Sequence, residues 1–296
     1  MTLGTIGIIG FGEAGGILAQ DLAARGISVQ VYDRLQDDPA GRTAITAKAN
    51  ALGVRLCHDA AEAIADAALV ISAVTAGSAL EVAKTAAATI RAGQLFMDIN
   101  SIAPATKQAA SVAIQHSGAG YVDAAVMAPV PPRRLQTPIL LGGREAGALS
   151  AALNALGFAT RVVSQEVGVA SAIKMCRSVM IKGLEALTTE SLRTARHYGA
   201  EAEVLASLHQ SFPSMGWDGD LPHYLISRVA EHGRRRAEEM EEVAQTVCAA
   251  GVAPDMSEAI VRAQRGLVDA MASLDLRYAE LEPFSWTDLA DRLRVG

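Results

Sequence analysis

Short β-branched runs alternate with alanine-rich segments of helical length from Gly4 to about Val163. This alternation is typical of repeated strand–helix–strand units, which build a mostly parallel sheet. Strands are predicted at residues 6–9, 28–32, 54–56, 69–73, 95–99, 121–125 and 139–141. Helices are expected to begin near Gly12, Thr43, Ala60, Ser78, Pro104 and Arg144.

The second half of the chain carries a different pattern. After Val163 the β-branched runs stop, and the remaining residues show interrupted helical periodicity. The interruptions fall at residues 197–199, 212–221, 251–254 and 283. Residues 167–193 contain no proline and are predicted to form one long helix. We therefore predict an α/β domain over residues 1–163 and an all-α domain over residues 164–296, joined by a long central helix.

Length and hydropathy narrow the class of protein. A chain of 296 residues is long enough for two domains with a core in each. Half of the residues are hydrophobic, but no apolar run approaches the roughly 20 residues that a membrane-spanning helix needs. The N-terminus reaches glycine almost at once and lacks the apolar core of a secretory signal. We therefore expect a cytoplasmic protein without a membrane partner.

Charge and cysteine content exclude further classes. A net charge of −6 argues against nucleic acid as a partner, and the basic residues 234–236 are followed at once by acidic ones, as on a solvated helix face. Cys57, Cys176 and Cys248 are odd in number and widely spaced, so they predict core thiols rather than a disulfide framework or a zinc site. No metal site is expected.

A glycine motif stands directly after the first predicted strand. Its three glycines form the pattern GxGxxG, which permits a tight turn, close approach of a pyrophosphate and close helix–strand packing. The helix that follows offers unpaired N–H groups and the positive end of its dipole to phosphates. The motif predicts a Rossmann domain that binds a dinucleotide, although such glycines also occur where they merely turn a chain. The expected cofactor-binding residues of this loop are Gly10, Phe11, Gly12, Glu13, Ala14 and Gly15.

The end of the second predicted strand bears on the choice of cofactor. Asp33 lies about 20 residues beyond the motif, where a carboxylate accepts hydrogen bonds from the adenosine ribose. Asp33, Asp37 and Asp38 favour NAD, because carboxylates would repel the 2′-phosphate of NADP. Arg34 leaves NADP open, since an arginine at this position can bind that phosphate. Asp33 and Arg34 are therefore both expected to contact the cofactor.

Polar residues form a narrow stripe on the predicted long helix. At 100° per residue, the stripe spans less than about 90°, while most of the remaining helix surface is apolar. A helix that is apolar nearly all round is expected to be buried, and a polar stripe on it suggests a lined cavity. Lys174 in such a cavity suits general acid/base catalysis, whereas its alternative is to reach water or to pair with its neighbours. The stripe consists of Ser171, Lys174, Ser178, Glu185 and Thr189, with Lys182 at its edge.

Several motifs that follow one another along the chain resemble the β-hydroxyacid dehydrogenase superfamily. They are the glycine loop, residues 98–101 with Pro104 and Lys107, residues 123–126, residues 142–143, and Gly168 with Lys174. The superfamily includes 3-hydroxyisobutyrate dehydrogenase, tartronate semialdehyde reductase and 6-phosphogluconate dehydrogenase. Four further segments resemble the sequences of a less characterised branch, whose members are described only as 6-phosphogluconate-dehydrogenase-like NAD(P)-binding proteins. These segments are residues 127–132, 170–176, 238–244 and 254–256.

The resemblance implies roles for individual residues. Lys174 matches the catalytic lysine of the family, and Ser101 matches a position beside the nicotinamide ribose and the substrate. The segment from Asp123 to Met127 matches the start of the family's substrate loop, so both residues are expected to contact the substrate. The further cofactor contacts implied by the resemblance are Val74, Thr75 and Asn100.

Three departures from the family pattern fall near the expected substrate. The usual Ser-Gly-Gly turn is replaced by residues 127–129, Met-Ala-Pro, which makes a stiffer and more apolar turn. An asparagine one turn after the lysine is replaced by Ser178, which still forms hydrogen bonds. A late lysine is absent, with residues 238–240 in register and Arg235 or Arg236 as its candidate replacements.

Two further groups of residues are candidates for positions near the substrate. An anionic substrate would need a cation, and Arg133, Arg134 and Arg177 are the candidates, although each also suits a solvated surface. The turn at residues 217–224 is polar and aromatic, and we expect it to cap a helix pair, with closure over the substrate as the alternative.

Together these residues predict an NAD(P)-dependent dehydrogenase that acts on a small β-hydroxy acid or a related carbonyl acid. Lys174 is the expected general acid/base, Ser101 and Ser178 orient the substrate, and decarboxylation after oxidation is an option. Two alternatives stay open: an imine reductase, which generally carries another proton donor at the lysine position, and a non-catalytic dinucleotide sensor. The resemblance also implies a homodimer in which the C-terminal domains pack together.

Overall fold

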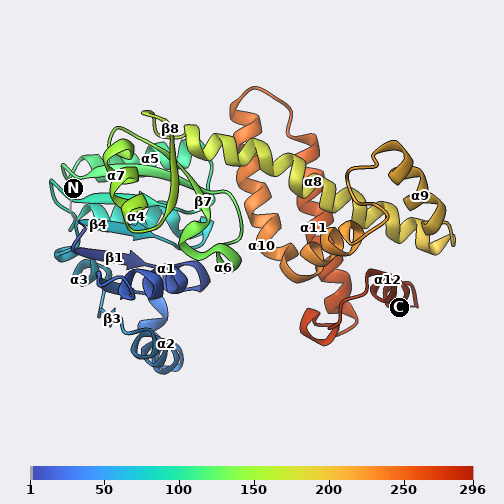
Figure 1. Cartoon of the computed structure of the whole chain (residues 1–296), viewed down its shortest axis with the longest axis horizontal. Helices are drawn as coiled ribbons and strands as arrows, with labels where there is room; N and C mark the ends of the chain where they lie inside the picture. Colours follow the sequence, from blue (N-terminus) through green and yellow to red (C-terminus); the bar gives the residue numbers. More distant parts are fainter. Residues whose placement is uncertain (1–2, 296) are drawn as a thin grey trace. The chain divides into compact units, whose positions relative to one another are not determined.

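The chain forms two compact units, Met1–Lys174 and Met175–Gly296. The computed structural model describes residues 3–295 (Figure 1). A long helix, α8 (Val169–His197), runs from one unit into the other, so the division falls inside a helix. The sequence prediction divided the chain between residues 163 and 164 instead.

One eight-stranded sheet forms the centre of the first unit. The strands are β1 (Thr5–Ile9), β2 (Ser28–Tyr32), β3 (Arg55–Leu56), β4 (Leu69–Ser72), β5 (Leu95–Asp98), β6 (Gly120–Val126), β7 (Pro138–Gly142) and β8 (Ala159–Ser164). They lie in the order β3-β2-β1-β4-β5-β6-β7-β8. All neighbouring strands are parallel except β6 and β7, which are antiparallel. The first six strands follow the Rossmann order.

Helices cover both faces of this sheet. One face carries α1 (Glu13–Ala23), α2 (Pro39–Leu52) and α7 (Ala146–Ala155), and the other carries α3 (Ala60–Ala65), α4 (Ala79–Ala87) and α5 (Pro104–Gln115). Ile8 of β1 lies in the first of the two resulting apolar cores and Ile9 in the second, as expected for a strand buried on both faces. Short helical turns lie in the loops: η1 (Arg34–Gln36), η2 (Ala76–Ser78), α6 (Val130–Arg133) and η3 (Arg134–Gln136).

The predicted α/β fold with a mostly parallel sheet and a helical second part is confirmed, but two elements differ from the prediction. Strand β8 was missed, because Thr160 is its only buried residue and the apolar pattern of this edge strand is weak. Helix α2 begins at Pro39 rather than near Thr43. The Asp38 carboxylate accepts a hydrogen bond from the Ala40 N–H, and proline suits a first helical position.

The described residues of the second unit form helices joined by turns and loops, with no strand among them. It contains the remainder of α8, α9 (Glu201–Ser211), α10 (Leu221–Ala249), α11 (Asp255–Ser273), the turn η4 (Tyr278–Glu280) and α12 (Trp286–Val295). Helices α10 and α11 approach closely at Gly233, where a Cβ would lie 2.4 Å from the Gln264 carbonyl oxygen. A separate apolar core in this unit includes Leu192, Ile226 and Leu267.

Two sequence expectations about exposure can be compared with the structure. Within residues 3–295, no helix is both long and apolar enough to cross a membrane. The prediction of three core thiols is correct for Cys57 but wrong for Cys176 and Cys248, which are exposed on their helices. Burial raises the pKa of the Cys57 thiol to about 11.

Candidate active site

The glycine loop between β1 and α1 approaches the sheet closely. Gly10 has a φ of +94°, and a Cβ there would lie 2.3 Å from the Ala73 carbonyl oxygen. A Cβ on Gly15 would lie 2.0 Å from the Gly10 carbonyl oxygen, whereas one on Gly12 would meet no atom within 4 Å. The loop is therefore tightly packed at Gly10 and Gly15 and open at Gly12, as a dinucleotide cradle requires.

The N-terminus of α1 begins in this open part of the loop. Gly12 is its N-cap, and no side chain of the described residues caps it. The first-turn N–H groups have no partner inside the helix and lie at the positive end of its dipole. Glu13 and Ala14 belong to this turn, and the Glu13 side chain is exposed. These donors fit the pyrophosphate of a dinucleotide.

Asp33, at the end of β2, is hydrogen-bonded to the glycine loop. Its Oδ2 accepts from the Phe11 N–H at 2.7 Å, and its Oδ1 accepts from the Leu35 N–H at 3.0 Å. The N–H group of Phe11, a predicted cofactor-binding residue, thus has its partner within the protein. Each carboxylate oxygen of the half-buried Asp33 keeps a second lone pair that suits a ribose hydroxyl. Arg34 follows it and is exposed.

Asn100 joins two loops at the carboxyl edge of the sheet. Its Oδ1 accepts from the Val74 N–H at 2.7 Å, and its Nδ2 donates to Ser72 Oγ at 2.9 Å. The side chain is buried, so it holds the turn after β4, which carries Val74 and the exposed Thr75, against the turn after β5. The Asn100 side chain therefore joins these loops, and the contact of Asn100 with the cofactor stays a prediction.

A buried ionic cluster lies behind these loops, with Asp98, Lys107 and Asp123 all 0 % exposed. Lys107 Nζ lies 3.0 Å from Asp98 Oδ1 and 3.5 Å from Asp123 Oδ1. Tyr121 donates its hydroxyl to Asp98 Oδ2 at 2.8 Å. Burial, followed by the charge of Asp98, raises the pKa of Tyr121 well above its usual value of 10.0, so this hydroxyl remains a donor.

Asp123 holds the start of α8. Its Oδ2 accepts hydrogen bonds from the N–H groups of Gly168 and Ser171, both at 3.0 Å, and from the Ser171 hydroxyl at 3.1 Å. A carboxylate here satisfies unpaired helix donors and interacts favourably with the helix dipole. The fully buried carboxylate of Asp123 thus positions the helix, and a contact of this residue with the substrate stays a prediction.

Lys174 lies on α8 one turn after Ser171. Its Nζ donates a hydrogen bond to Ser101 Oγ at 2.5 Å, and both residues are half-buried. Ser101 follows β5, whose carboxyl end lies at the same sheet edge as that of β1 because the intervening strands are parallel. The structure therefore brings together Lys174 and Ser101, which were predicted to act together, at the edge that also carries the glycine loop.

In the second unit, ion pairs fill the polar stripe of α8. Lys182 Nζ lies 2.8 Å from Glu239 Oε2 of α10, and it donates to Ser178 Oγ at 3.4 Å. Ser178 and Lys182 are both buried. The predicted lined cavity is therefore wrong for this part of the helix, because α10 supplies a partner charge that the pattern of α8 alone does not reveal.

Glu185 continues this buried layer. Both of its carboxylate oxygens accept from Arg236 Nη1 at 2.7 Å, and Gln264 Nε2 donates to Oε2 at 3.2 Å. Burial raises the pKa of Glu185, against the lowering effect of Arg236. Burial likewise lowers the pKa of Arg236. The guanidinium of Arg236, a candidate replacement for the family's late lysine, is thus engaged by Glu185.

The residues expected around the substrate loop have varied surroundings. Met127 is half-buried and packs against an apolar cluster formed by β6, β7 and α8. Arg134 Nε donates to both carboxylate oxygens of Asp21 at 3.0 Å, so this candidate for substrate recognition instead ties η3 to α1. Hydrogen bonding to Asp21 raises the pKa of Arg134. Arg133 and Arg177 are exposed and stay candidates for binding an anion.

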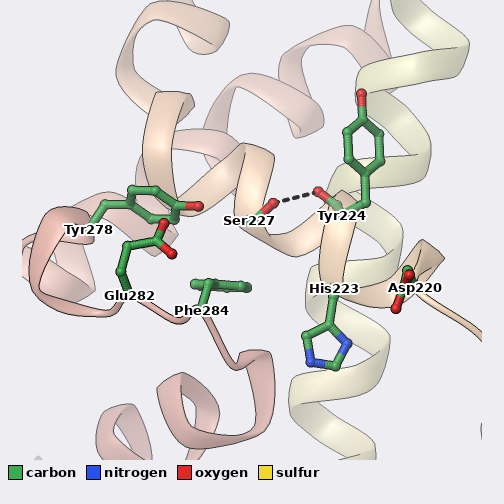
Figure 2. A pocket seen from close by; sticks show the side chains of 7 residues that line it. All are labelled: Asp220, His223, Tyr224, Ser227, Tyr278, Glu282 and Phe284. Atoms are coloured by element: carbon green, nitrogen blue, oxygen red, sulfur yellow. Dashed lines mark hydrogen bonds between the residues drawn. The ribbon is translucent and has the colours of Figure 1, made fainter.

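A pocket of about 290 Å³ lies in the second unit beside the start of α10 (Figure 2). The Tyr278 and Phe284 rings lie 5.6 Å apart on one side of it, and Ser227 donates its hydroxyl to the Tyr224 carbonyl at 2.9 Å. The polar turn predicted around residues 217–224 thus leads into a pocket shared with the segment after α11. The lining residues are Asp220, His223, Tyr224, Ser227, Tyr278, Glu282 and Phe284.

Sequence reasoning missed two residues of the first unit that contact the candidate site. Lys48 donates to the glycine loop from a helix that carries none of the motifs, and Tyr121, two residues before Asp123, completes the buried ionic cluster. Gly16, directly after the motif, was the one local signal, because it extends the glycine run beyond GxGxxG. Over residues 3–295, no group of three His, Cys, Asp or Glu side chains is arranged to hold a metal ion.

The Rossmann sheet, the glycine cradle and the Lys174–Ser101 pair define a nicotinamide-dinucleotide-binding protein with a hydroxyacid-dehydrogenase-like fold. Comparison with family models agrees: residues 5–167 match the NAD binding domain of 6-phosphogluconate dehydrogenase. Residues 195–267 match a domain of unknown function, DUF1932. The chain therefore belongs to the family defined by the 6-phosphogluconate dehydrogenase NAD-binding domain.

Three similar proteins extend this result over nearly the whole chain. A conserved hypothetical protein from Sinorhizobium meliloti is 37% identical, with a TM-score of 0.78, and the match covers 99% of this chain and 97% of that one. A protein of unknown function described as structurally similar to 3-hydroxyacid dehydrogenases is 35% identical, with a TM-score of 0.69, 90% of this chain and 98% of that one being covered. An uncharacterized 28.5 kDa protein from Methanothermus fervidus is 30% identical over 85% of this chain and 94% of its own length.

Proposed function

We propose that this protein is an NAD(P)-dependent oxidoreductase that transfers a hydride between nicotinamide and a small β-hydroxy acid or a related carbonyl acid. The observation that carries the proposal is the hydrogen bond from Lys174 Nζ to Ser101 Oγ, at the sheet edge where the glycine loop begins α1. An amine that can exchange a proton thus lies in the unit that carries the dinucleotide cradle, as a dehydrogenase requires.

The dinucleotide would be held by the glycine loop and Asp33. The unpaired N–H groups at the start of α1 suit the pyrophosphate, and the free lone pairs of Asp33 suit the ribose hydroxyls. We propose NAD as the preferred cofactor, because Asp33, Asp37 and Asp38 place carboxylates around the position of a 2′-phosphate. Arg34 is the residue that would favour NADP.

In the oxidative direction, Lys174 in its neutral form accepts the proton of the substrate hydroxyl while the carbinol C–H bond breaks and the carbonyl forms. Nicotinamide, when bound, supplies the hydride acceptor, and in the reverse reaction the hydride donor. Ser101, held by Lys174, orients the reacting oxygen. A β-keto acid produced in this way can lose carbon dioxide, so decarboxylation belongs to the proposal as an optional second step.

Substrate binding is proposed to involve a cation and small polar groups on α8. Arg177 is exposed and three residues after Lys174, and its guanidinium suits a carboxylate or phosphate. The buried Ser178 hydroxyl accepts a hydrogen bond from Lys182 and keeps its own proton to donate, and Met127 can supply an apolar wall. Two alternatives are less well supported. An imine reductase would need a different proton donor at position 174. A non-catalytic dinucleotide sensor would have no use for the Lys174–Ser101 pair.

We also propose that the protein forms a homodimer through α8. Met180 and Leu187 are 67% and 58% exposed, and the half-buried Leu184 lies between them on the same helix face. Such a seven-residue spacing of apolar side chains suits helix–helix pairing, and an identical copy offers the same surface in return. This exposed face also corrects the expectation that α8 is buried all round within one chain.

The experiment for the proposed function compares Lys174→Ala with the wild type and with Lys84→Ala, a change of an exposed lysine on α4. A panel of hydroxy acids is screened by NADH absorbance, and both dinucleotides are titrated by fluorescence. Lys174→Ala should bind NADH as the wild type does but lose about 10²- to 10⁴-fold in kcat/KM. Full turnover by Lys174→Ala would refute the role of the lysine, and tighter binding of NADPH than NADH would refute the preference for NAD.

A further inference from the structure

Lys48 reaches from α2 to the glycine loop, 36 residues away in sequence. Its Nζ donates hydrogen bonds to the Phe11 carbonyl at 2.6 Å and to the Gly12 carbonyl at 2.9 Å. The same ammonium lies 4.5 Å from the centre of the buried Phe11 ring, within cation–π range. One side chain therefore contacts the two peptide groups that lead into the N-terminus of α1.

Gly16 provides the space that this side chain occupies. A Cβ on Gly16 would lie 2.7 Å from Lys48 Nζ and 2.9 Å from its Cε, although the GxGxxG pattern itself requires no glycine at this position. Any larger residue would push the end of the lysine away from the two carbonyl groups. The fourth glycine of the loop and Lys48 thus form one structural feature.

The contacts of Lys48, together with the hydrogen bond from the Gly16 N–H to the same Gly12 carbonyl at 3.0 Å, determine where the loop's N–H groups point. In a trans peptide, the C=O and the N–H of the same plane point in opposite directions. With the Phe11 and Gly12 carbonyl oxygens turned toward Lys48, the N–H groups of Gly12 and Glu13 point away from it. These are the donors at the start of α1 that no side chain of the described residues caps.

The ammonium also brings a positive charge to the loop. Burial lowers the pKa of Lys48, while the charge of Asp33 raises it. Asp33 holds the Phe11 N–H and Lys48 holds the Phe11 carbonyl, so opposite charges fix both sides of this residue. The glycine loop is thereby pinned from two elements, β2 and α2.

We infer that Lys48 is a positioning residue for the dinucleotide pyrophosphate: it locks the Phe11 and Gly12 carbonyls so that the N–H groups at the start of α1 face the phosphates, and its charge adds to their attraction. This inference rests on the proposed binding of a nicotinamide dinucleotide, but not on the proposed chemistry at Lys174. Because both dinucleotides carry the pyrophosphate, Lys48 should serve NADH and NADPH alike.

The test is a fluorescence titration of NADH and NADPH with Lys48→Met, which keeps the length of the side chain but removes its hydrogen bonds and charge. Dissociation constants for both dinucleotides should rise about 10- to 100-fold, as expected from lost charge-assisted hydrogen bonds. The affinity should also become less dependent on salt, because one positive charge near the phosphates is gone. Gly16→Ala should weaken both dinucleotides in the same direction while keeping the lysine, and Lys48→Arg should retain part of the affinity.

Lys84→Met is the matched control, since this exposed lysine of α4 pairs only with Glu81 in the described structure, and it should bind as the wild type does. Wild-type affinity and salt dependence in Lys48→Met, even with a lower melting temperature, would reduce Lys48 to a link between α1 and α2 and overturn the inference. A loss confined to NADPH would move its contact to the 2′-phosphate and likewise overturn it. A wild-type chain that binds neither dinucleotide would overturn the proposed function itself, whatever the variants do.

Discussion

At the scale of single residues, the buried ionic cluster under the candidate site contains two carboxylates but one ammonium group. Among the described residues, Lys107 is the one cation paired with the two carboxylates Asp98 and Asp123, and none of the three side chains is exposed. Removing one member of a buried ionic group leaves the rest uncompensated in a medium of low polarity. The helix-start N–H groups around Asp123 and the Tyr121 hydroxyl on Asp98 supply the remaining stabilisation.

Lys107→Met should therefore lower the free energy of unfolding by about 3–5 kcal/mol, because two carboxylates lose their shared cation. Urea unfolding followed by circular dichroism measures this change. Lys84→Met, at an exposed i,i+3 pair, should change it by less than about 0.5 kcal/mol. A similarly small effect of Lys107→Met would contradict the assignment of Lys107 as the charge that stabilises Asp98 and Asp123.

At the scale of secondary-structure elements, α8 serves two purposes along its length. Its first turn is held by Asp123, and Lys174 lies on the next turn, so the cap and the proposed acid/base are separated by a single helical turn. Its later turns bury Lys182 and Glu185 against α10 and α11. The same helix thus positions the candidate chemistry and organises the core of the second unit.

The buried Glu185 predicts a dependence of stability on pH. Its folded-state pKa is raised above the usual 4.5, chiefly by burial. Its contribution to stability is therefore complete below the unfolded value and is lost as pH rises through the folded value. The unfolding free energy of the wild type relative to Glu185→Gln should fall as pH increases upward from 4.5.

Urea unfolding at several pH values, followed by the fluorescence of Trp217 and Trp286, measures this relative stability within the second unit. Glu238→Gln, which changes an exposed carboxylate of α10, is the control and should show no such trend. A relative stability that rises with pH would mean that Arg236 outweighs burial and lowers the pKa of Glu185.

At the scale of the whole molecule, the proposed homodimer would cover the exposed apolar face of α8. Met180 and Leu187 expose large side chains that a second copy would remove from water. The double variant Met180→Glu with Leu187→Glu should be monomeric where the wild type is dimeric, because two charges per chain would be buried in the interface. Size-exclusion chromatography with light scattering measures the mass, and circular dichroism checks the fold.

The control for this prediction is Arg234→Glu on α10. Together with the native Glu238 it also places two glutamates at exposed positions of one helix, and it should keep the wild-type mass. A wild-type protein that elutes as a monomer at all concentrations would refute the homodimer. A dimer that survives both glutamates on α8 would place the interface on another surface.

The sequence by itself determined what depends on near neighbours. The period of two or three to four residues predicts strands and helices, and the GxGxxG loop with Asp33 predicts the dinucleotide cradle, because turn geometry, helix dipole and strand length all act over short separations. The fold class and the family followed from this order of motifs. Lys174 and Ser101 were paired in advance only through the resemblance of their motifs to a known family.

Only the tertiary structure decided which partner each polar group takes. The Asp123 carboxylate accepts hydrogen bonds from Gly168 and Ser171, and Lys182 in the stripe of α8 pairs with Glu239 of α10. Neither partner follows from the sequence pattern, because burial and pairing join residues far apart in the chain. Lys48 shows the same limit: its sequence surroundings are those of an ordinary helix, and its contact with the glycine loop exists only because α2 packs beside α1. Spacing along the chain encodes local geometry, whereas the partner of a buried charge is determined by three-dimensional packing.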